Sequence, residues 1–284
     1  MARFMPMRLS YFLAALGGEV FFLLSARHRD IVGANIERVV GLELDKRRQR
    51  QKVRSVFKTM TKNYCDLTKL SQLRLENLEE KVSIEGWYHL TKAVADGNGV
   101  IIASAHLGNF EVAARVLALR GIKMTIFVEA FDSTPFLRNI AKLRQGNGAR
   151  ILPVSTGALR EGLQILRNNG TIGLVCDRNI HGNGFKISFF GEETSVPSGA
   201  LSLALRTGAA IVPIFSVRKS SNHFAIYIEP PLELVDTGNR TQSVRANLKN
   251  LISTMEKYIC QYPEQWAVLE PIWSKHKVES NSTP

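Results

Sequence analysis

Short apolar runs alternate with amphipathic stretches through most of the chain. Residues 100–105 form a continuous apolar run with β-branched side chains, which is typical of a buried strand. Residues 109–120 follow with apolar positions at helical spacing and end at Gly121. The same criteria predict further strands at residues 124–128, 151–154, 171–176, 186–190, 210–217 and 224–229, and further helices at 135–145, 158–168, 198–206 and 243–261. This alternation predicts an α/β fold with a mostly parallel central sheet flanked by helices.

The first quarter of the chain lacks this alternation. Residues 9–26 are almost entirely apolar and are bordered by arginines, but they are at the short end of the roughly 20 residues that cross a bilayer. Glu19 lies in the middle of the run, where a carboxylate is costly in hydrocarbon. The pattern favours a membrane hairpin, a short anchor or a helix lying in the membrane interface. A signal peptide and an ordinary buried helix are the alternatives.

A second helix is predicted in this part of the chain, and it is strongly basic. Its apolar positions, spaced by three and four residues, are Val53, Val56, Phe57, Met60, Tyr64 and Leu67. Most of its other positions between 46 and 62 are Lys or Arg. The formal net charge of the 284-residue chain is +12, and residues 1–75, with 15 Lys/Arg against 6 Asp/Glu, contribute +9 of it. This asymmetry indicates an anionic partner, which is nucleic acid, an acidic protein or a membrane surface. A solvated helix face that is basic is the alternative.

An anionic membrane surface fits the basic region better than nucleic acid does. Aromatic side chains are not interleaved with the basic ones, and no helix-turn-helix, zinc-finger or RNA-recognition pattern occurs. A basic helix beside an anionic leaflet gains roughly 1 kcal/mol for each Lys or Arg near the surface. We therefore predict a membrane-associating basic helical region at residues 1–75 and an α/β domain at residues 76–284, with no nucleic acid partner.

The composition is that of a globular protein and gives no sign of a metal centre. Hydrophobic residues make up 45% of the chain and charged residues 22%, which rules out a disordered chain. Cys65, Cys176 and Cys260 are far apart in the sequence, which argues against a zinc ribbon and against a disulfide framework. The six histidines have no spacing typical of metal ligands. We therefore expect neither a metal nor a bound cofactor.

A histidine and a carboxylate lie close together after the first predicted strand. In open sheets functional groups gather at the carboxyl ends of strands, where His106 is expected. Asn109 is a good N-cap for the following helix, which places Glu111 in its first turn. There Glu111 could accept from one imidazole nitrogen of His106 and leave the other free as a base. No G-x-S-x-G motif or neighbouring cysteine supplies a nucleophile, so the pattern indicates activation of a substrate hydroxyl for attack on an acyl group. A structural histidine is the alternative.

Asp177 and Arg178 follow the strand expected at residues 171–176. An acid and a guanidinium at a strand end suit the binding of a phosphate, or of a sugar hydroxyl beside a phosphate. The alternative is a local ion pair that ties down the loop at residues 179–185.

Two longer stretches resemble a known family. GVIIASAHLGNFE at residues 99–111 and FFGEETSVPSGALSLALRTGAAIVP at residues 189–213 resemble the bacterial lysophospholipid acyltransferase superfamily. They are most similar to its lipid A biosynthesis lauroyl/myristoyl acyltransferases, and the resemblance covers most of the chain. It implies that His106 is the general base and that Glu111 orients it.

The resemblance also implies roles for further residues. An oxyanion formed during acyl transfer needs hydrogen-bond donors, for which Asn109, nearby backbone amides and one arginine are candidates. Arg144 stands where relatives carry an arginine, and there it would reach the acyl carbonyl or a phosphate of the acceptor; a solvated helix residue is the alternative. Relatives place an aspartate at the position of Asp177. The lipid A enzymes usually follow it with glutamine, whereas Arg178 is more similar to the phosphatidylinositol mannoside acyltransferases.

The function implied by the resemblance is that of a membrane-associated O-acyltransferase, which moves a fatty acyl chain to a hydroxyl of a glycolipid such as a lipid A precursor. Its co-substrate would be a thioester of acyl carrier protein or CoA. Its place would be the cytoplasmic face of the bacterial inner membrane, peripherally or through a single N-terminal anchor.

Three other functions stay open. One is acylation of a phosphatidylinositol mannoside, and another is acylation of a lysophospholipid. The lysophospholipid branch usually has Asn and Asp where this chain has Ala105 and Glu111. The non-enzymatic alternative is a basic membrane-binding protein with a structural His106.

Overall fold

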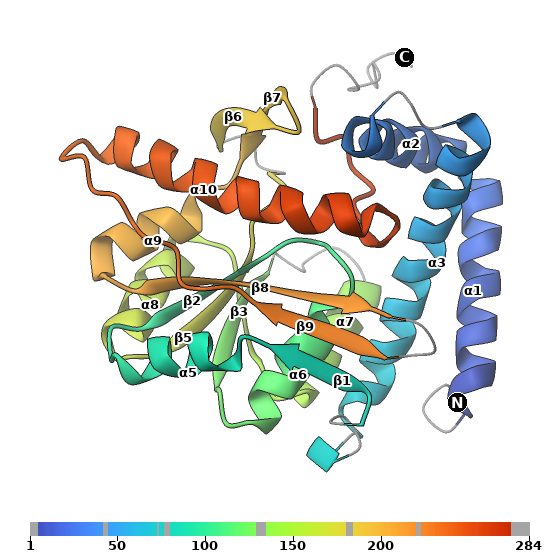
Figure 1. The fold of residues 1–284 in the computed structure, drawn as a ribbon. Coiled ribbons are helices and arrows are strands. Elements are labelled where there is room, and N and C mark those ends of the chain that lie inside the picture. The colour runs from blue at the N-terminus through green and yellow to red at the C-terminus, as the bar shows by residue number, and fades with distance from the viewer. Residues whose placement is uncertain are drawn as a thin grey trace.

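A seven-stranded sheet forms the centre of the molecule (Figure 1). The computed structural model describes residues 5–41, 45–72, 74–76, 80–128, 135–179, 184–219 and 223–273. Its strands are β1 (Val82–Glu85), β2 (Val100–Ser104), β3 (Met124–Val128), β4 (Arg150–Pro153), β5 (Thr171–Val175), β6 (Phe185–Phe189), β7 (Glu192–Val196), β8 (Ala210–Arg218) and β9 (Phe224–Ile228). The sheet order is β1-β9-β8-β2-β5-β3-β4; β8 and β9 are antiparallel, and all other neighbours are parallel. This confirms the predicted α/β fold with a mostly parallel sheet flanked by helices.

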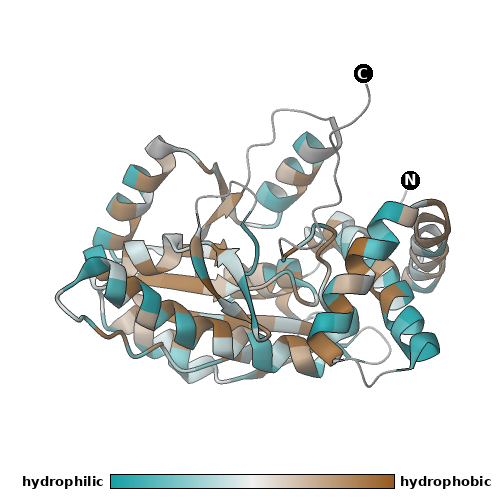
Figure 2. Cartoon of the chain, turned by 90° about the horizontal axis from the view of Figure 1, so that it is seen from above, coloured by the Kyte–Doolittle hydropathy of each residue, from teal (hydrophilic) through white to brown (hydrophobic). Residues whose placement is uncertain are grey.

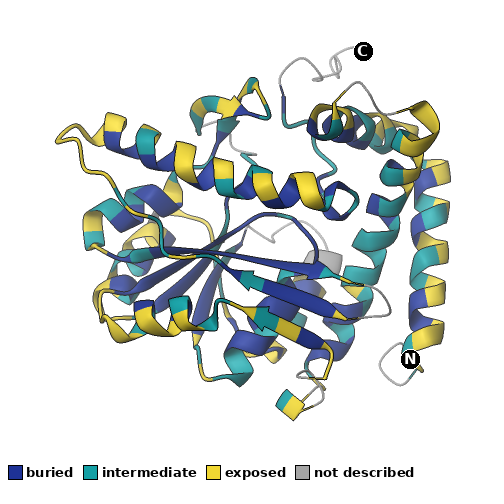
Figure 3. Ribbon diagram, viewed as in Figure 1, coloured by how far each residue is buried: buried dark blue, intermediate teal, exposed yellow. Residues whose placement is uncertain are grey.

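Helices lie on both faces of this sheet and beside it. They are α1 (Met7–Leu24), α2 (Ala26–Val40), α3 (Lys46–Leu70), α5 (Trp87–Ala95), α6 (Phe110–Leu119), α7 (Pro135–Gly146), α8 (Thr156–Arg167), α9 (Gly199–Thr207), α10 (Arg240–Gln261) and the short 3-10 helix η3 (Pro263–Gln265). The side chains of β2 show how the helices cover the two faces of the sheet, because successive residues of a strand point to opposite faces. Ile101 and Ala103 pack in a core with α8, α9 and α10, whereas Val100 and Ile102 pack with α5 and α6. All five residues of β2 are buried, as expected for a central parallel strand (Figure 3).

The N-terminal helices form a layer at one side of the sheet. In Figure 1, α3 runs between α1 and the α/β body. Gly18 lets α1 come close to α3, since a side-chain carbon at that position would lie 2.8 Å from the backbone of Phe57 and Lys58. Asn35 of α2 donates to the Glu270 carbonyl at 3.0 Å and so ties this layer to the C-terminal segment. The division of the chain into domains at residue 75 stays a prediction.

Helix α1 is long and apolar enough to cross a membrane, by its length and composition alone, and it is the one such helix among the described residues. Only 22% of it is buried, and its outer face is apolar (Figure 2). Its inner face carries Glu19, which pairs with Arg54 at 2.5 Å and with Lys58 at 3.1 Å on α3. The carboxylate that is unfavourable for a membrane span is therefore matched by cations within the protein.

The predicted helices and strands from residue 100 onward are confirmed to within a few residues. β1, α5, β7 and the short η3 lie in stretches for which the pattern predicts no element, and α2 lies between the two helices predicted in the first quarter of the chain. β1 is a four-residue edge strand with a single buried residue, Val82, and β7 reads Glu-Glu-Thr-Ser-Val. β7 pairs with β6 because Phe190 and Gly191 take positive φ values of 50° and 77° and close a tight hairpin. A phenylalanine in this conformation is uncommon, so the turn is not visible in the sequence.

Candidate active site

His106 and Asp177 are brought together by β2 and β5. Ser104 of β2 pairs in register with Val175 of β5, so the residues two positions beyond each strand lie side by side. His106 Nδ1 lies 2.8 Å from Asp177 Oδ1, and the backbone N–H of His106 donates to Asp177 Oδ2 at 3.0 Å. Both residues were expected at strand ends, and the sheet order shows that these two ends are neighbours.

Asp177 is fully buried and ionised. Trp266 Nε1 donates to its Oδ2 at 2.8 Å, which adds a third hydrogen bond to the two from His106. Burial by itself raises the pKa of Asp177, but the neighbouring His106 and the hydrogen bonds from its imidazole, from Trp266 and from the backbone hold that pKa below its ordinary value. The carboxylate therefore stays charged at neutral pH and fixes the imidazole through a charge-assisted hydrogen bond.

The imidazole of His106 keeps one nitrogen for chemistry. When Nδ1–H donates to Asp177, Nε2 is the acceptor of the neutral ring. The His106 side chain is 23% exposed, although its partner carboxylate is not exposed at all. Phe110 packs edge-on beside the ring, with the two centroids 6.1 Å apart. An imidazole in this setting can take a proton at Nε2 from a hydroxyl that reaches it.

Glu111 does not orient His106 in the structure, and the predicted contact between them is wrong. Asn109 caps α6 as expected, because its Oδ1 accepts from the Glu111 backbone N–H at 3.2 Å, and Glu111 lies in the first turn. Its carboxylate, however, accepts from Arg144 Nε of α7 at 2.6 Å. The physical reason is that Asp177 already occupies Nδ1 from the neighbouring strand end. A catalytic role for Glu111 stays a prediction.

Arg144 lies on the same side of the site as His106. Its guanidinium carbon is 5.7 Å from the centroid of Phe110, the ring that also packs against the imidazole. The ion pair with Glu111 is largely buried, with 17% of the Arg144 side chain and 8% of the Glu111 side chain exposed. Arg144 is thus a fixed cation near the candidate base and not the freely solvated helix residue that was its alternative.

Arg178 and Tyr64 complete this side of the site. Arg178 forms an ion pair with Glu270 of the C-terminal segment at 2.6 Å. Tyr64 of α3 is 40% exposed and lies in the electrostatic field of Arg144, Glu111, Arg178 and Glu270. The partial burial of its phenol raises the pKa of that group. One helix of the N-terminal layer therefore contributes a side chain to the charged surroundings of His106.

Asn109 faces away from the site, which disagrees with its predicted contact with the substrate. The residue is buried, and its Nδ2 donates to Asp66 Oδ2 at 2.7 Å. Its Oδ1 caps α6, so both atoms of the amide group are used inside the protein. Asp66 also accepts from Tyr11 of α1 and from Arg218 of β8. Asn109 thus belongs to a buried polar cluster that fixes the turn after His106.

Comparison with known proteins identifies the family. The pattern of the bacterial lipid A biosynthesis acyltransferases matches residues 1–275. The chain belongs to this family. The resemblance noted in the sequence is thereby confirmed, as is the prediction of an acyltransferase, and the non-enzymatic alternative is set aside.

The acyltransferase is also similar to curated mycobacterial proteins. It is 28% identical over 231 residues to the phosphatidylinositol mannoside acyltransferase of Mycobacterium tuberculosis, strain CDC 1551 / Oshkosh. The aligned residues cover 80% of this chain and 68% of that protein. The protein of the same name from Mycolicibacterium smegmatis is 26% identical over 225 residues, which is 78% of this chain and 72% of the relative. Together with the family match, these relatives support an acyl donor and a lipid acceptor as substrates in general.

Two residues beside the candidate active site, Trp266 and Tyr64, were not predicted from the sequence. Trp266 is 89 positions from Asp177, and no local pattern connects the two. Tyr64 lies in the apolar stripe of α3 and looks like an ordinary core position. Among the described residues, no group of three or more His, Cys, Asp and Glu side chains is placed to hold a metal ion. The expected absence of a metal and of a bound cofactor stays a prediction.

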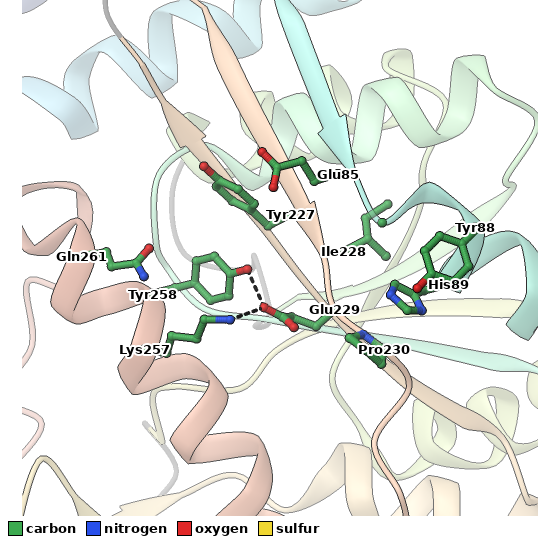
Figure 4. A pocket seen from close by; sticks show the side chains of 11 residues that line it. Glu85, Tyr88, His89, Tyr227, Ile228, Glu229, Pro230, Lys257, Tyr258 and Gln261 are labelled. Atoms are coloured by element: carbon green, nitrogen blue, oxygen red, sulfur yellow. Dashed lines mark hydrogen bonds and ion pairs between the residues drawn. The ribbon is translucent and has the colours of Figure 1, made fainter.

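A separate hollow of about 450 Å³ lies between the ends of β1 and β9 and helix α10 (Figure 4). Three tyrosines, two glutamates, His89 and Lys257 contribute to its wall. Glu229 accepts there from Lys257 at 2.8 Å and from Tyr258 at 2.5 Å, so its carboxylate is already paired. The hollow contains none of the predicted site residues.

Proposed function

We propose that the enzyme transfers a fatty acyl group from a thioester of acyl carrier protein or CoA to a hydroxyl of a glycolipid, with His106 as general base. The observation that carries the proposal is the hydrogen bond from His106 Nδ1 to the buried, ionised Asp177. This bond leaves Nε2 as an acceptor near a fixed cation. A base held in this way removes a proton from a hydroxyl as its oxygen attacks a carbonyl carbon.

The proposed reaction needs no reactant besides the thioester and the acceptor hydroxyl. The acceptor oxygen forms a bond to the acyl carbonyl carbon, and the carbon–sulfur bond of the thioester breaks. The proton passes from the hydroxyl to His106 Nε2 and then to the departing thiolate, while Asp177 stabilises the intervening imidazolium. We propose neither a metal nor a cofactor besides the thioester.

Arg144 and Arg178 supply positive charge for the substrates. Arg144, held by Glu111, is proposed to stabilise the oxyanion or the acyl carbonyl together with backbone amides. Arg178, held by Glu270, is proposed to contact a phosphate or sugar of the acceptor beside Asp177. Because the side chain of Asp177 is buried and used by His106 and Trp266, its proposed part is to hold the base.

Two glycolipids are candidate acceptors. The family supports a lipid A precursor. The mycobacterial relatives, together with Arg178 after Asp177, support a phosphatidylinositol mannoside. In either case we place the enzyme at the cytoplasmic face of the bacterial inner membrane, where its basic N-terminal region would meet anionic lipid.

The proposal is tested by acyl transfer with the purified full-length protein, followed by mass spectrometry. Palmitoyl and lauroyl thioesters of acyl carrier protein and of CoA would be offered with a Kdo-bearing lipid A precursor, a phosphatidylinositol mannoside or lysophosphatidate. We expect the mass of one acyl chain to be added to one of the two glycolipids. A product only from lysophosphatidate would contradict the glycolipid assignment.

Substitution of His106 by glutamine tests the mechanism in the same assay. Loss of the base should lower kcat by about 10²–10⁴-fold. His89→Gln is the matched control, since His89 lies in the separate hollow of Figure 4, and we expect it to keep the wild-type rate. A folded His106→Gln protein that transfers acyl groups at the wild-type rate would overturn the mechanism.

A further inference from the structure

The outer face of α1 concentrates exposed apolar side chains. Seven of the twelve large hydrophobic residues that are exposed in the described part of the chain belong to this helix. They are Leu9, Phe12, Leu13, Leu16, Val20, Leu23 and Leu24. Their spacing of three and four residues puts them on one face that runs the whole length of α1 (Figures 2 and 3). A continuous apolar face of this kind marks an interaction surface.

The opposite face of α1 is held by α3 along almost its full length. Near the start of α1, Tyr11 donates to the buried Asp66. In the middle, Glu19 pairs with cations of α3, and Gly18 sits against the α3 backbone. Near the end, Phe22 packs edge-on against Phe57, with the ring centroids 5.6 Å apart. The inner face of α1 is thus packed against α3, with polar contacts at Tyr11 and at Glu19.

These contacts decide how α1 can meet a membrane. A helix of 18 residues is about 27 Å long, just short of the hydrocarbon thickness of about 30 Å. To cross the bilayer, α1 would have either to leave α3 or to carry α3 into the hydrocarbon. Leaving α3 would separate Tyr11 from Asp66 and Glu19 from both of its cations. Helix α3 is rich in Lys and Arg between residues 46 and 62, and such charges are excluded from hydrocarbon. A helix that stays on α3 and turns one face outward avoids both costs.

Positive charge borders the apolar face at its ends. Arg8 lies at the start of α1, and Arg27 follows its end. The beginning of α3 lies beside that end, because the guanidinium carbon of Arg50 is 5.9 Å from the centroid of the Phe22 ring. The exposed Lys and Arg residues there are Lys46, Arg47, Arg48 and Arg50. An apolar face with a cationic border is complementary to anionic headgroups above acyl chains.

We propose that α1 docks in the plane of one leaflet of an anionic bilayer by this face and does not cross it. A second copy of the chain fits the face poorly, because pairing two copies would bring like-charged borders together. The inference rests on the proposed function only in that the acceptor is a lipid. Docking by α1 would also bring the candidate active site near the membrane. Tyr11 of α1 donates to Asp66, and Asp66 accepts from Asn109, which lies three positions after His106. The docked helix therefore holds the candidate active site beside the lipid surface.

Flotation with vesicles tests the face itself, without acyl donor or acceptor. The full-length protein would be mixed with phosphatidylcholine vesicles that contain or lack phosphatidylglycerol. We expect binding to the anionic vesicles, and an about ten-fold or greater fall in the ratio of bound to free protein for the double variant Leu13→Glu/Leu16→Glu. Leu159→Glu, at an exposed leucine of α8, is the matched control and should bind like the wild type. Equal binding of the double variant and the wild type would overturn the proposal.

Spin labels distinguish docking from crossing. In a Cys65→Ser/Cys260→Ser background, where the remaining Cys176 is buried, the variants Leu9→Cys, Leu16→Cys and Leu23→Cys would each carry one nitroxide. The depth of each nitroxide in the vesicle would be measured by power saturation. In-plane docking predicts the same shallow depth at all three positions. A label at Leu16 that is deep while the other two are shallow would show a crossing helix and refute the proposal.

One further outcome would also refute the proposal. If the wild type stays free of vesicles and forms a dimer that Leu13→Glu/Leu16→Glu dissociates, the face is a self-interface and the proposal fails. Because no acyl transfer is measured, an enzyme with the wrong acceptor or base would still give the predicted docking, so failure of the proposed function and failure of this inference are separable.

Discussion

Two buried carboxylates, Asp177 and Glu111, lie beside the candidate active site and hold different partners. Asp177 accepts from His106 and Trp266, whereas Glu111 accepts from Arg144. Glu111 is five positions from His106 in the sequence, and Asp177 is 71 positions away. The more distant residue contacts the base because β2 and β5 are neighbours in the sheet. Strand order, and not spacing along the chain, selects the carboxylate that holds the histidine.

The two carboxylates also differ in how they are fixed. Asp177 receives a backbone N–H as well as two side-chain donors, so its position is set by the strand end itself. Glu111 lies in the first turn of α6, where the helix N-terminus favours a carboxylate, and its side chain reaches across to α7. One carboxylate fixes a base and the other fixes a cation. Exchange of each for its amide should therefore have distinguishable effects.

The largest effect is expected for Asp177→Asn. An asparagine at this position can donate to Nδ1 and so favour the wrong tautomer of His106, which would place the proton on Nε2. We expect kcat for acyl transfer to fall by about 10²–10⁴-fold. Steady-state kinetics with thioester and glycolipid would measure this. Wild-type kcat in a folded Asp177→Asn protein would contradict the assignment of Asp177 as the partner of the base.

A smaller and different effect is expected for Glu111→Gln. The variant keeps the hydrogen bond to Arg144 but loses the charge that holds the guanidinium, so the cation shifts relative to the substrate. We expect kcat/KM to fall by up to about 10²-fold. A loss as large as that of Asp177→Asn, with an altered tautomer of His106, would mean that Glu111 acts on the base after all.

Double-mutant cycles sharpen the comparison further. Glu111→Gln and Arg144→Gln remove the two halves of one ion pair, so their effects on the free energy of unfolding should be coupled by about 0.5–3 kcal/mol. Glu111→Gln and Asp177→Asn have no shared partner and should add to within about 0.5 kcal/mol. Urea unfolding of the single and double variants would provide the energies. Strong coupling of the two carboxylates would show that they act as one unit.

The smallest effect is a pH dependence of stability. Because the pKa of Asp177 in the folded protein lies below its ordinary value, the ionised carboxylate stabilises the fold above about pH 4, and this contribution is lost as the pH falls through the folded-state pKa. Asp177→Asn should therefore be less stable than the wild type at pH 7, and this difference should shrink as the pH is lowered below 4. Denaturant unfolding over this pH range would measure the difference. A difference that grows toward low pH would contradict the direction of the pKa shift.

The sheet was predictable because its strands are short apolar runs with β-branched side chains, of which residues 100–105 are the clearest. The edge strand β1 and the polar strand β7 were not, since their pairing depends on a neighbouring strand and on the turn at Phe190. Propensity and periodicity carry no information on such partners. The same limit explains why Trp266, far along the chain, was not connected with Asp177.

The sequence predicted where the candidate site lies, but not which side chains contact one another in it. His106 and Asp177 were both expected at strand ends, and the structure joins them. Glu111 was predicted to contact His106 because the two are near in sequence. The order of the strands, however, determines which carboxylate contacts His106. Asn109 was expected to face the substrate, whereas the buried Asp66 on α3 draws its amide inward. Both errors come from tertiary neighbours that no local pattern contains.

The most direct test of the account is the tautomer of His106, read by NMR of the protein labelled with ¹⁵N at histidine. The signal would be assigned with His106→Gln. We expect a proton on Nδ1 and a free Nε2 in the wild type, no change in Glu111→Gln, and loss of this pattern in Asp177→Asn. A His106 signal that changes in Glu111→Gln and stays as it is in Asp177→Asn would contradict the central claim that Asp177 holds the base.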